Sequence, residues 1–423
     1  MPRRAVHLSA PAGGKQMDDG VTFRPTLFGS FFLGGFECST HRRADGRRLD
    51  LIAGTGHDRL AAEDYRQLAE HGIRTVRDGV RWHLVEAAPG HRGWSAVLPL
   101  LRAAEAAGAR VIWDLCHYGW PDHLDVWSAD FVARFADYAA AFARLHLEET
   151  GRPPLLCPVN EIAYFAWAGG DHALMNPCAT GRADELKRQL VRAALAGTAA
   201  ARAAVPGTTV FAAEPAINVV PRPHADPLPA RTYTASQYDP FDMLTGRRDP
   251  ELGGAPQALD VVGVNFYWNN QWVYPDAARP PDAGPDWRPS RDALSAYDPR
   301  WRPFREMLAE VHARYRRPVF VAETSIEGAP RAAWLRYVCE EVRAAIRMGV
   351  PVEGICLYPV LSHPGWDDDR YCDNGLFEMA SQEGRRLVHA PLADELRRQQ
   401  HLMATLFAAG PVPAYAAAAA AGE

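Results

Sequence analysis

The sequence predicts a single (β/α)8 barrel with extended loops at its C-terminal face, and three observations support this fold. Its 423 residues suffice for one barrel with insertions. Apolar runs typical of strands alternate with amphipathic helical segments along most of the chain. These strand–helix pairs number close to eight, and eight such units close a barrel of parallel strands. We expect the barrel to span residues 23–409, between a flexible tail at 1–22 and a low-complexity tail at 410–423.

The first half of the chain repeats the strand–helix scheme evenly. Gly108 and the stretch Gly151-Arg152-Pro153-Pro154 each follow a helical pattern, and glycine and proline are typical residues just after a helix. The predicted elements are, in order, a strand at 27–36, a helix at 58–71, a strand at 73–77, a helix at 95–107, a strand at 110–115, a helix at 129–149 and a strand at 155–159.

The second half follows the same scheme less regularly. The predicted elements are a helix at 183–204, a strand at 209–213, a strand at 259–266, a helix at 304–315, a strand at 318–322, a helix at 331–348, a strand at 354–358 and a helix at 392–406. The Pro-rich stretch from 214 to 254 lacks helical periodicity, so we expect no helix there, and the sequence assigns no role to residues 214–258. A long loop rich in Trp, Pro and Asp is expected from 267 to 302.

Composition excludes several classes of partner. The formal net charge of −5 offers no basic face for phosphates, which argues against a nucleic-acid partner and favours a neutral ligand. The seven cysteines are scattered without any Cys-x-x-Cys pair, so neither a disulfide framework nor a thiolate metal site is indicated. The basic start lacks a following apolar stretch, and no segment is long enough to span a membrane. We therefore expect a cytoplasmic protein without a membrane partner.

Two glutamates stand where apolar runs end in opposite halves of the chain. Glu161 follows the fourth predicted strand and Glu323 follows the seventh. Active sites of such barrels form at the C-terminal strand ends, and cleavage of a glycosidic bond requires two carboxyl groups on a rigid scaffold. A single glutamate at a strand end is more often a solvated group or an ion-pair partner, so the pair carries the hypothesis. Glu37 and Glu214 also end predicted strands, but their order along the barrel fits the two-carboxylate scheme less well.

Other polar residues follow strands that open onto the same mouth. Arg77 could be a structural ion-pair partner, or it could keep a neighbouring carboxylate ionised. His117 could equally be a satisfied core residue or a metal ligand, but no second histidine stands at ligand spacing and we expect no metal. Asn160, Asn265 and Tyr267 complete the set, and the aromatic-rich loop after Tyr267 suits the stacking of sugars.

In its motifs and in their order along the chain, the protein resembles glycoside hydrolase family 1, the β-glucosidase family, or a sister family in the same clan of retaining barrels. The similarity rests on Phe31-Phe32-Leu33-Gly34-Gly35, on the Arg77 and Trp82 spacing, on His117, on Asn160-Glu161-Ile162, on Asn265-Phe266-Tyr267 and on Ala322-Glu323-Thr324-Ser325. It implies that Glu323 is the nucleophile, that Glu161 is the acid/base residue and that Arg77 binds near the nucleophile. It further implies a small β-glycoside as substrate, such as a β-glucoside or β-galactoside, and no cofactor.

The chain departs from the family pattern at several positions. Ile162 replaces the proline of the acid/base motif, Thr324-Ser325 replaces Asn-Gly after the nucleophile, and His41 stands where the family has a glutamine that grips the sugar. Of the family's last segment the chain keeps Trp366, a stacking candidate, but not the glutamate. Asp367, Asp368 and Asp369 follow, and their charge is expected to disfavour a phosphorylated sugar. A transglycosidase with the same two glutamates and a non-catalytic sugar-binding barrel remain as alternatives.

Overall fold

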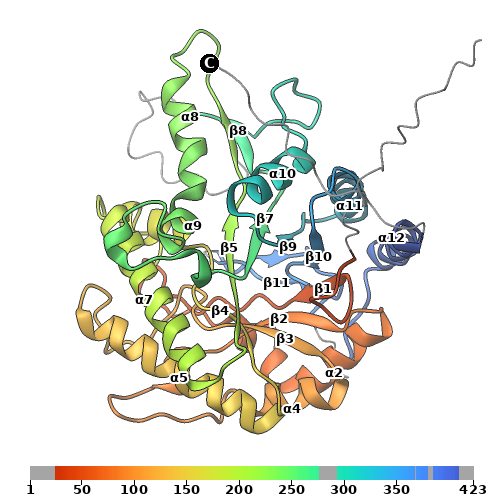
Figure 1. Cartoon of the computed structure of the whole chain (residues 1–423). Coiled ribbons are helices and arrows are strands. Elements are labelled where there is room, and N and C mark those ends of the chain that lie inside the picture. Colours follow the sequence, from red (N-terminus) through yellow and green to blue (C-terminus); the bar gives the residue numbers. More distant parts are fainter. Residues whose placement is uncertain (1–23, 276–292, 367, 380–383, 409–423) are drawn as a thin grey trace, which may run out of the picture.

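A computed structural model describes residues 24–275, 293–366, 368–379 and 384–408, and in them eight parallel strands close a barrel (Figure 1). The strands are β1 (Phe32–Gly35), β2 (Thr75–Gly79), β3 (Arg110–Asp114), β4 (Leu155–Cys157), β5 (Thr209–Pro215), β7 (Val261–Asn265), β9 (Val319–Thr324) and β10 (Val352–Leu357). Each strand pairs with the next in chain order, and β10 pairs with β1. The predicted (β/α)8 barrel is confirmed.

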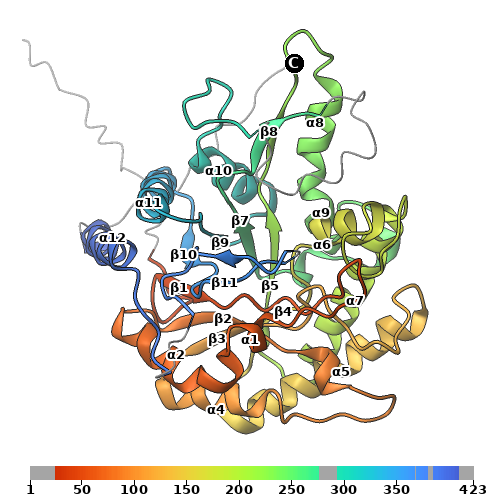
Figure 2. The same cartoon turned by 180° about the vertical axis from the view of Figure 1, so that it is seen from behind.

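Helices surround the barrel (Figure 2). Several of them have the bounds that the sequence predicts. Helices α7 (Ala183–Ala204) and α10 (Phe304–Tyr315) begin and end at the predicted residues. At the start of α5 (Ala129–Thr150), the Ser128 side chain accepts a hydrogen bond from Phe131 N, and Gly151 ends that helix at a φ of 69°. The helices are α1 (Leu51–Gly54), α2 (His57–Glu70), α3 (Trp82–Val85), α4 (Leu98–Ala107), α5 (Ala129–Thr150), α6 (Ile162–Phe165), α7 (Ala183–Ala204), α8 (Leu228–Ala235), α9 (Asp239–Leu244), α10 (Phe304–Tyr315), α11 (Arg331–Arg347) and α12 (Ala390–Ala408).

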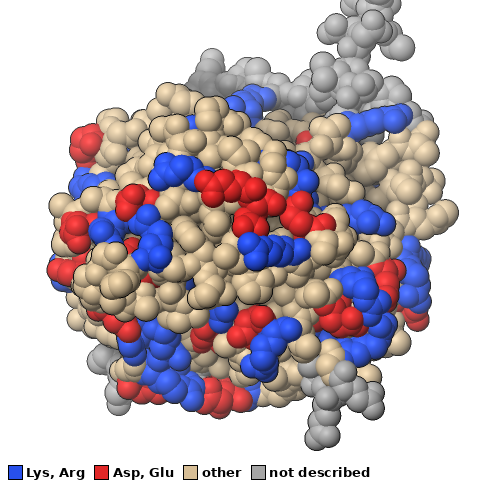
Figure 3. All heavy atoms as spheres, turned by 90° about the horizontal axis from the view of Figure 1, so that it is seen from below, with Lys and Arg blue, Asp and Glu red and all other residues tan. Residues whose placement is uncertain are grey.

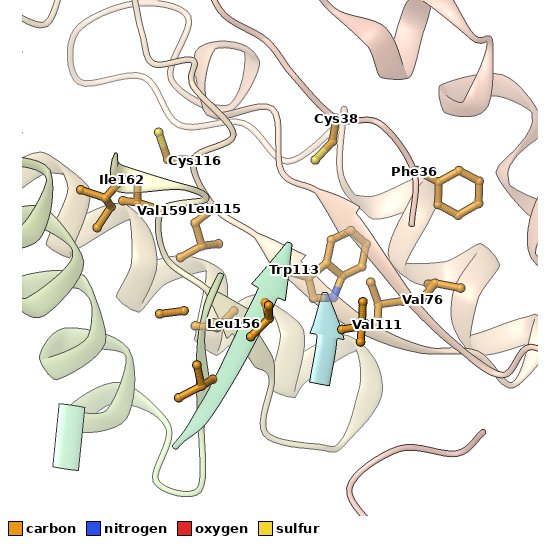
Figure 4. Packing of buried hydrophobic residues seen from close by; sticks show 14 of the residues in the cluster. Phe36, Cys38, Val76, Val111, Trp113, Leu115, Cys116, Leu156, Val159 and Ile162 are labelled. Atoms are coloured by element: carbon orange, nitrogen blue, oxygen red, sulfur yellow. The ribbon is translucent and has the colours of Figure 1, made fainter. Parts of the chain in front are cut away.

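Alternate residues of each strand pack into two apolar layers. One layer fills the barrel interior and includes Leu33, Ile112, Phe211, Phe320 and Cys356. The other lies between the strands and the helices, and Figure 4 shows part of it, with Val76, Val111, Trp113 and Leu156. Because side chains alternate along a strand, a residue two positions beyond an interior residue points into the barrel mouth.

The loops at the C-terminal face carry structure that the sequence did not indicate. Between β5 and β7 the chain forms β6 (Asn218–Val220), α8 and α9, so the expectation of no helix there is wrong. Pro229 and Pro240 lie in the first turns of α8 and α9, where proline needs no intrahelical partner for its nitrogen, so the proline content did not exclude helices. Strand β8 (Gln271–Val273) pairs with β6, and both strands project from the barrel with α8 (Figure 1). The strands β11 (His363–Pro364) and β12 (Tyr371–Cys372) form a second small sheet after β10.

Three sequence expectations concern residues outside the described ones, namely the two tails at 1–22 and 410–423 and the part of the aromatic loop at 276–292. In the described part of the chain, no helix combines the length and the apolar character needed to cross a membrane. Acidic and basic side chains are interspersed on the face shown in Figure 3. That face therefore offers no broad basic surface for a polyanion.

Candidate active site

The nine predicted site residues lie at or just beyond the C-terminal ends of the strands, and a network of hydrogen bonds and ring contacts joins them. Arg77, Asn265 and Glu323 are on strands β2, β7 and β9, and the others follow a strand. The full set is His41, Arg77, His117, Asn160, Glu161, Asn265, Tyr267, Glu323 and Trp366.

Glu323 points into the mouth because β9 contains one extra residue. Val321 pairs with Val264 and with Ile355, but the next pairs are Glu323 with Asn265 and Thr324 with Leu357. Such a bulge bends the strand and redirects a side chain, and here it turns Glu323 away from the helix side. Glu323 was expected just after the strand, whereas β9 extends to Thr324 and holds Glu323 inside it.

Two donors bind the carboxylate of Glu323. Arg77 Nη1 donates to Oε1 over 3.0 Å, and the Tyr267 hydroxyl donates to Oε2 over 2.7 Å. Arg77 is fully buried and also donates to Ala322 O at 2.9 Å, Asp114 Oδ2 at 2.6 Å and Asn160 Oδ1 at 3.0 Å. The ion pairs with Asp114 and Glu323 outweigh burial and raise the pKa of Arg77 well above its usual value. Arg77 is therefore a fixed positive charge beside the nucleophile candidate.

Glu161 is bound differently, by neutral groups. Its backbone adopts the left-handed conformation with φ 44° and ψ 60°, and its N–H donates to Ala213 O of β5 over 2.9 Å. The Tyr118 hydroxyl donates to Oε2 and Asn265 Nδ2 donates to Oε1, both over 2.7 Å. Burial is the largest effect on this carboxyl and raises its pKa.

The two carboxyl groups compete for one proton. Burial and repulsion from Glu161 raise the pKa of Glu323 to about 7, against the opposing effect of Arg77. Of the two, Glu323 receives a hydrogen bond from a guanidinium, whereas the described partners of Glu161 are uncharged. We therefore assign the shared proton to Glu161 and the negative charge to Glu323. One carboxyl can thus act as an acid while the other acts as a nucleophile or base.

Asn160 and Asp114 orient His117. Because Asn160 Oδ1 accepts from Arg77, its Nδ2 faces His117 Nε2 as a donor, at 3.2 Å. His117 Nδ1 lies 3.0 Å from Asp114 Oδ2, so in this arrangement the ring is neutral with its proton on Nδ1. Burial favours that neutral form, although Asp114 and Glu37 raise the pKa of His117 above its usual value. The Nε2 atom is thus held at the edge of the mouth by Asp114 on β3 and by Asn160 after β4.

Cys38, Asp114 and His117 are three potential metal ligands that lie close together. Cys38 Sγ lies 3.2 Å from His117 Nδ1 and 3.8 Å from Asp114 Oδ2, and the three side chains are buried. Cys38 lies far from Asp114 and His117 in the sequence, so no short spacing between potential ligands indicated this cluster. The guanidinium of Arg77 already donates to the same Asp114 oxygen over 2.6 Å, which favours a hydrogen-bonded cluster over a cation site.

Aromatic rings form one wall of the mouth. The centroid of the Trp366 ring lies 5.3 Å from the ring centroid of His41, 5.6 Å from that of Tyr118 and 6.1 Å from that of Tyr164. His41 is buried, which lowers its pKa to about 3 and keeps it neutral, and its Nδ1 has no hydrogen-bond partner within the described structure. Since Tyr118 also binds Glu161, this wall begins at the acid/base candidate.

The two rival acids have other partners. Glu37 Oε1 accepts from Ser39 N over 3.0 Å and from Ser39 Oγ over 2.5 Å, and it lies 3.8 Å from His117 Nε2. Glu214 follows the interior residue Ala213 on β5, so strand alternation turns its side chain toward the helices. Its two oxygens accept backbone N–H groups instead of facing the mouth.

Asp114 and Tyr118 are contacts of the site that sequence reasoning missed. A signal for Asp114 existed, because it ends β3 two positions after the interior residue Ile112. Tyr118 directly follows His117 in the chain, and its contact with Glu161 joins loops after different strands.

The acidic loop after β10 does not carry the free charge that was expected of it. Asp369 pairs with Arg47 and with Arg43, and Asp368 lies 3.7 Å from Arg370. Asp367 is outside the described residues. Arg43 lies 326 positions from Asp369 in the chain, and Arg47 is similarly distant, so their pairing with the loop is not visible in the local sequence.

The sequence matches no model of a known protein family, and a comparison with curated protein sequences likewise finds no match. The fold is similar to solved β-glycosidases. The β-glycosidase from Thermosphaera aggregans matches with a TM-score of 0.70 at 16% identity, covering 90% of this chain and 97% of that one. The family 1 β-glucosidase from Thermotoga maritima gives 0.64 at 15% identity over 90% and 99%, and a complex of that enzyme with castanospermine gives 0.66 at 15% over the same shares. At such identities the likeness shows a shared barrel fold.

Proposed function

We propose that this protein is a retaining β-glycosidase that hydrolyses the O-glycosidic bond of a small β-glycoside, such as a β-glucoside or β-galactoside. The unequal surroundings of the two glutamates carry the proposal. Glu323 lies against the guanidinium of Arg77 and the Tyr267 hydroxyl, and Glu161 lies among uncharged donors. A pair of carboxyl groups kept in opposite protonation states is what glycosidases use.

In the first proposed step, a carboxylate oxygen of Glu323 attacks the anomeric carbon while the bond to the leaving oxygen breaks. The proton of Glu161 passes to that oxygen, and a covalent glycosyl-enzyme forms. In the second step, water attacks the same carbon, Glu161 takes a proton from it, and Glu323 departs as carboxylate. The sugar is released with its original configuration, and the two carboxyl groups suffice without a cofactor.

The remaining predicted residues have supporting roles in this proposal. Arg77 and Tyr267 keep Glu323 ionised and aimed, and Asn265 orients Glu161. Asn160 and His117 offer polar atoms to the sugar hydroxyls. His41 and Trp366 line the aromatic wall, where a sugar or aglycone ring can stack.

Two alternatives use the same mouth. A transglycosidase would pass the sugar to an alcohol instead of water, and product analysis in the presence of alcohols separates the two activities. A non-catalytic sugar-binding barrel would need the aromatic wall but not an ionised Glu323 beside Arg77. The contacts of Glu323 therefore favour an enzyme.

The test combines a panel of nitrophenyl glycosides with the variant Glu323→Ala. We expect the variant to lose about 10⁴-fold or more in kcat, because no covalent intermediate can form. Added azide should enter the vacated space and give a glycosyl azide of inverted configuration. Glu327→Ala is the matched control, since Glu327 is a half-exposed partner of Arg370 and should keep wild-type rates. Wild-type turnover by Glu323→Ala would refute the assignment.

A further inference from the structure

Glu214 is a buried carboxyl group directly beneath the acid/base candidate. Its Oε1 accepts from Ile162 N over 2.7 Å and its Oε2 accepts from Ala163 N over 3.0 Å. These are the two residues that follow Glu161. Both oxygens therefore bind the first turn of α6, which contacts β5 (Figure 2).

The backbone at Glu161 needs such support. A non-glycine residue in the left-handed region is strained by about 1 kcal/mol and persists only where its surroundings hold it. The helix that follows is a single turn, Ile162–Phe165, which continues into a π-helical turn at Ala166–Asp171. So short a helix is not stable by itself.

Strand β5 supplies the support on both sides of Glu161. The Glu161 N–H binds Ala213 O, and the next two N–H groups bind the Glu214 side chain. Three consecutive backbone donors are thus fixed to two consecutive residues of one barrel strand. This attachment sets the direction in which the Glu161 side chain points. The hydrogen bonds of its carboxyl group with Tyr118 and Asn265 depend on that direction.

We propose that Glu214 is a positioning residue that holds the backbone of Glu161 so that its carboxyl group meets the leaving oxygen. The inference rests on the proposed glycosidase function and deepens it. Glu214 does not touch the substrate. It acts through Glu161, so its removal affects the steps in which Glu161 transfers a proton.

The test compares two substrates that differ in their need for an acid. A dinitrophenyl glycoside needs little protonation of its leaving group, whereas an alkyl glycoside depends on it. In Glu214→Gln, one backbone N–H faces an amide NH2 in place of an acceptor, so the backbone of Glu161 shifts. A displacement of about 1 Å at the reacting group lowers the rate by ~10²-fold. We expect kcat/KM to fall about 10²-fold for the alkyl glycoside and less than ~10-fold for the dinitrophenyl glycoside.

Glu353 provides a matched control. It is also a buried carboxyl on a barrel strand, and its Oε2 accepts two backbone N–H groups, from Thr26 N over 2.9 Å and from Leu27 N over 3.1 Å. It lies at the opposite end of the barrel, at the start of β10. Glu353→Gln should lower thermal stability as Glu214→Gln does, but should leave the ratio of the two kcat/KM values at its wild-type value.

A double-mutant cycle gives a second readout. If Glu214 acts only through Glu161, Glu214→Gln should cause no further loss of kcat/KM in a Glu161→Ala background. Equal losses on both substrates, wild-type rates on the alkyl glycoside, or an added loss in that background would each overturn the inference. If Glu214→Gln does not fold, Glu214→Asp, which keeps both oxygens but is one methylene shorter, decides by the same comparison. Wild-type enzyme that cleaves neither substrate would instead refute the proposed function itself.

Discussion

Replacing Arg77 by methionine should raise the pKa of the nucleophile candidate Glu323. At an effective dielectric constant of about 20, two unit charges ~4 Å apart interact by about 4 kcal/mol, equivalent to ~3 pKa units. Arg77 shares its charge between Glu323 and Asp114, so we expect about one to two units of that shift at Glu323. Burial already raises the pKa of Glu323, and the loss of Arg77 removes an effect that lowers it.

The assay is kcat/KM as a function of pH with a dinitrophenyl glycoside. Such a substrate needs no protonated Glu161, so the acid limb reports the ionisation of Glu323 in the free enzyme. Activity falls as pH drops through this pKa, because only the carboxylate attacks. We expect this limb to lie at least about one pH unit higher in Arg77→Met than in the wild type.

Arg386→Met separates this effect from lost stability. Arg386 is also fully buried and binds Asp64 through two nitrogens, at 2.5 and 2.9 Å, away from the mouth. Removing one partner of a buried ion pair costs about 3–5 kcal/mol of folding free energy in either variant. Only Arg77→Met should move the acid limb, and an unmoved limb in folded Arg77→Met would contradict the role given to Arg77.

Two further predictions concern stability and substrate charge. Fully buried His57 lies 2.8 Å from Asp64 and 2.9 Å from Asp78; burial alone would lower its pKa, but the two aspartates raise it to about 9. A raised pKa contributes stability that is complete below the unfolded value of about 6.5 and is lost as pH rises through about 9, so the urea midpoint should fall between pH 6.5 and 9.5. His57→Gln should show a smaller fall over that interval, and an equal fall would remove His57 as the cause. We also expect a plain β-glycoside to be cleaved faster than its 6-phospho form at low salt, now because Glu37 Oε1 lies at the edge of the mouth, 3.8 Å from the neutral ring of His117, and its negative charge repels a phosphate. Faster cleavage of the phosphorylated substrate would show that Glu37 does not face the sugar.

Much of the site could be located from the sequence because barrel chemistry follows strand order. Each predicted residue stands at or after an apolar run, and parallel strands bring their C-terminal ends to one rim. That logic placed Glu161 and Glu323 in one mouth with Arg77 and Tyr267, which now share hydrogen bonds with Glu323. The catalytic roles themselves stay predictions.

The sequence could not separate the catalytic candidates from their rivals. Glu214 and Glu323 both stand near the ends of barrel strands. Strand alternation turns Glu214 toward the helices, and an extra residue in β9 turns Glu323 into the mouth. A bulge depends on how neighbouring strands pair, and one sequence read by itself does not contain that register.

By itself the sequence determined the barrel, the order of its strands and the rim where polar residues gather, because periodicity and helix-ending residues are local properties. The tertiary structure decided which charges meet. It paired Asp369 with Arg43 and Arg47, brought Cys38 to His117 and fixed the backbone after Glu161 to Glu214. These contacts join residues far apart in the chain, and their energy arises only when folding removes both partners from water and holds them at hydrogen-bond distance.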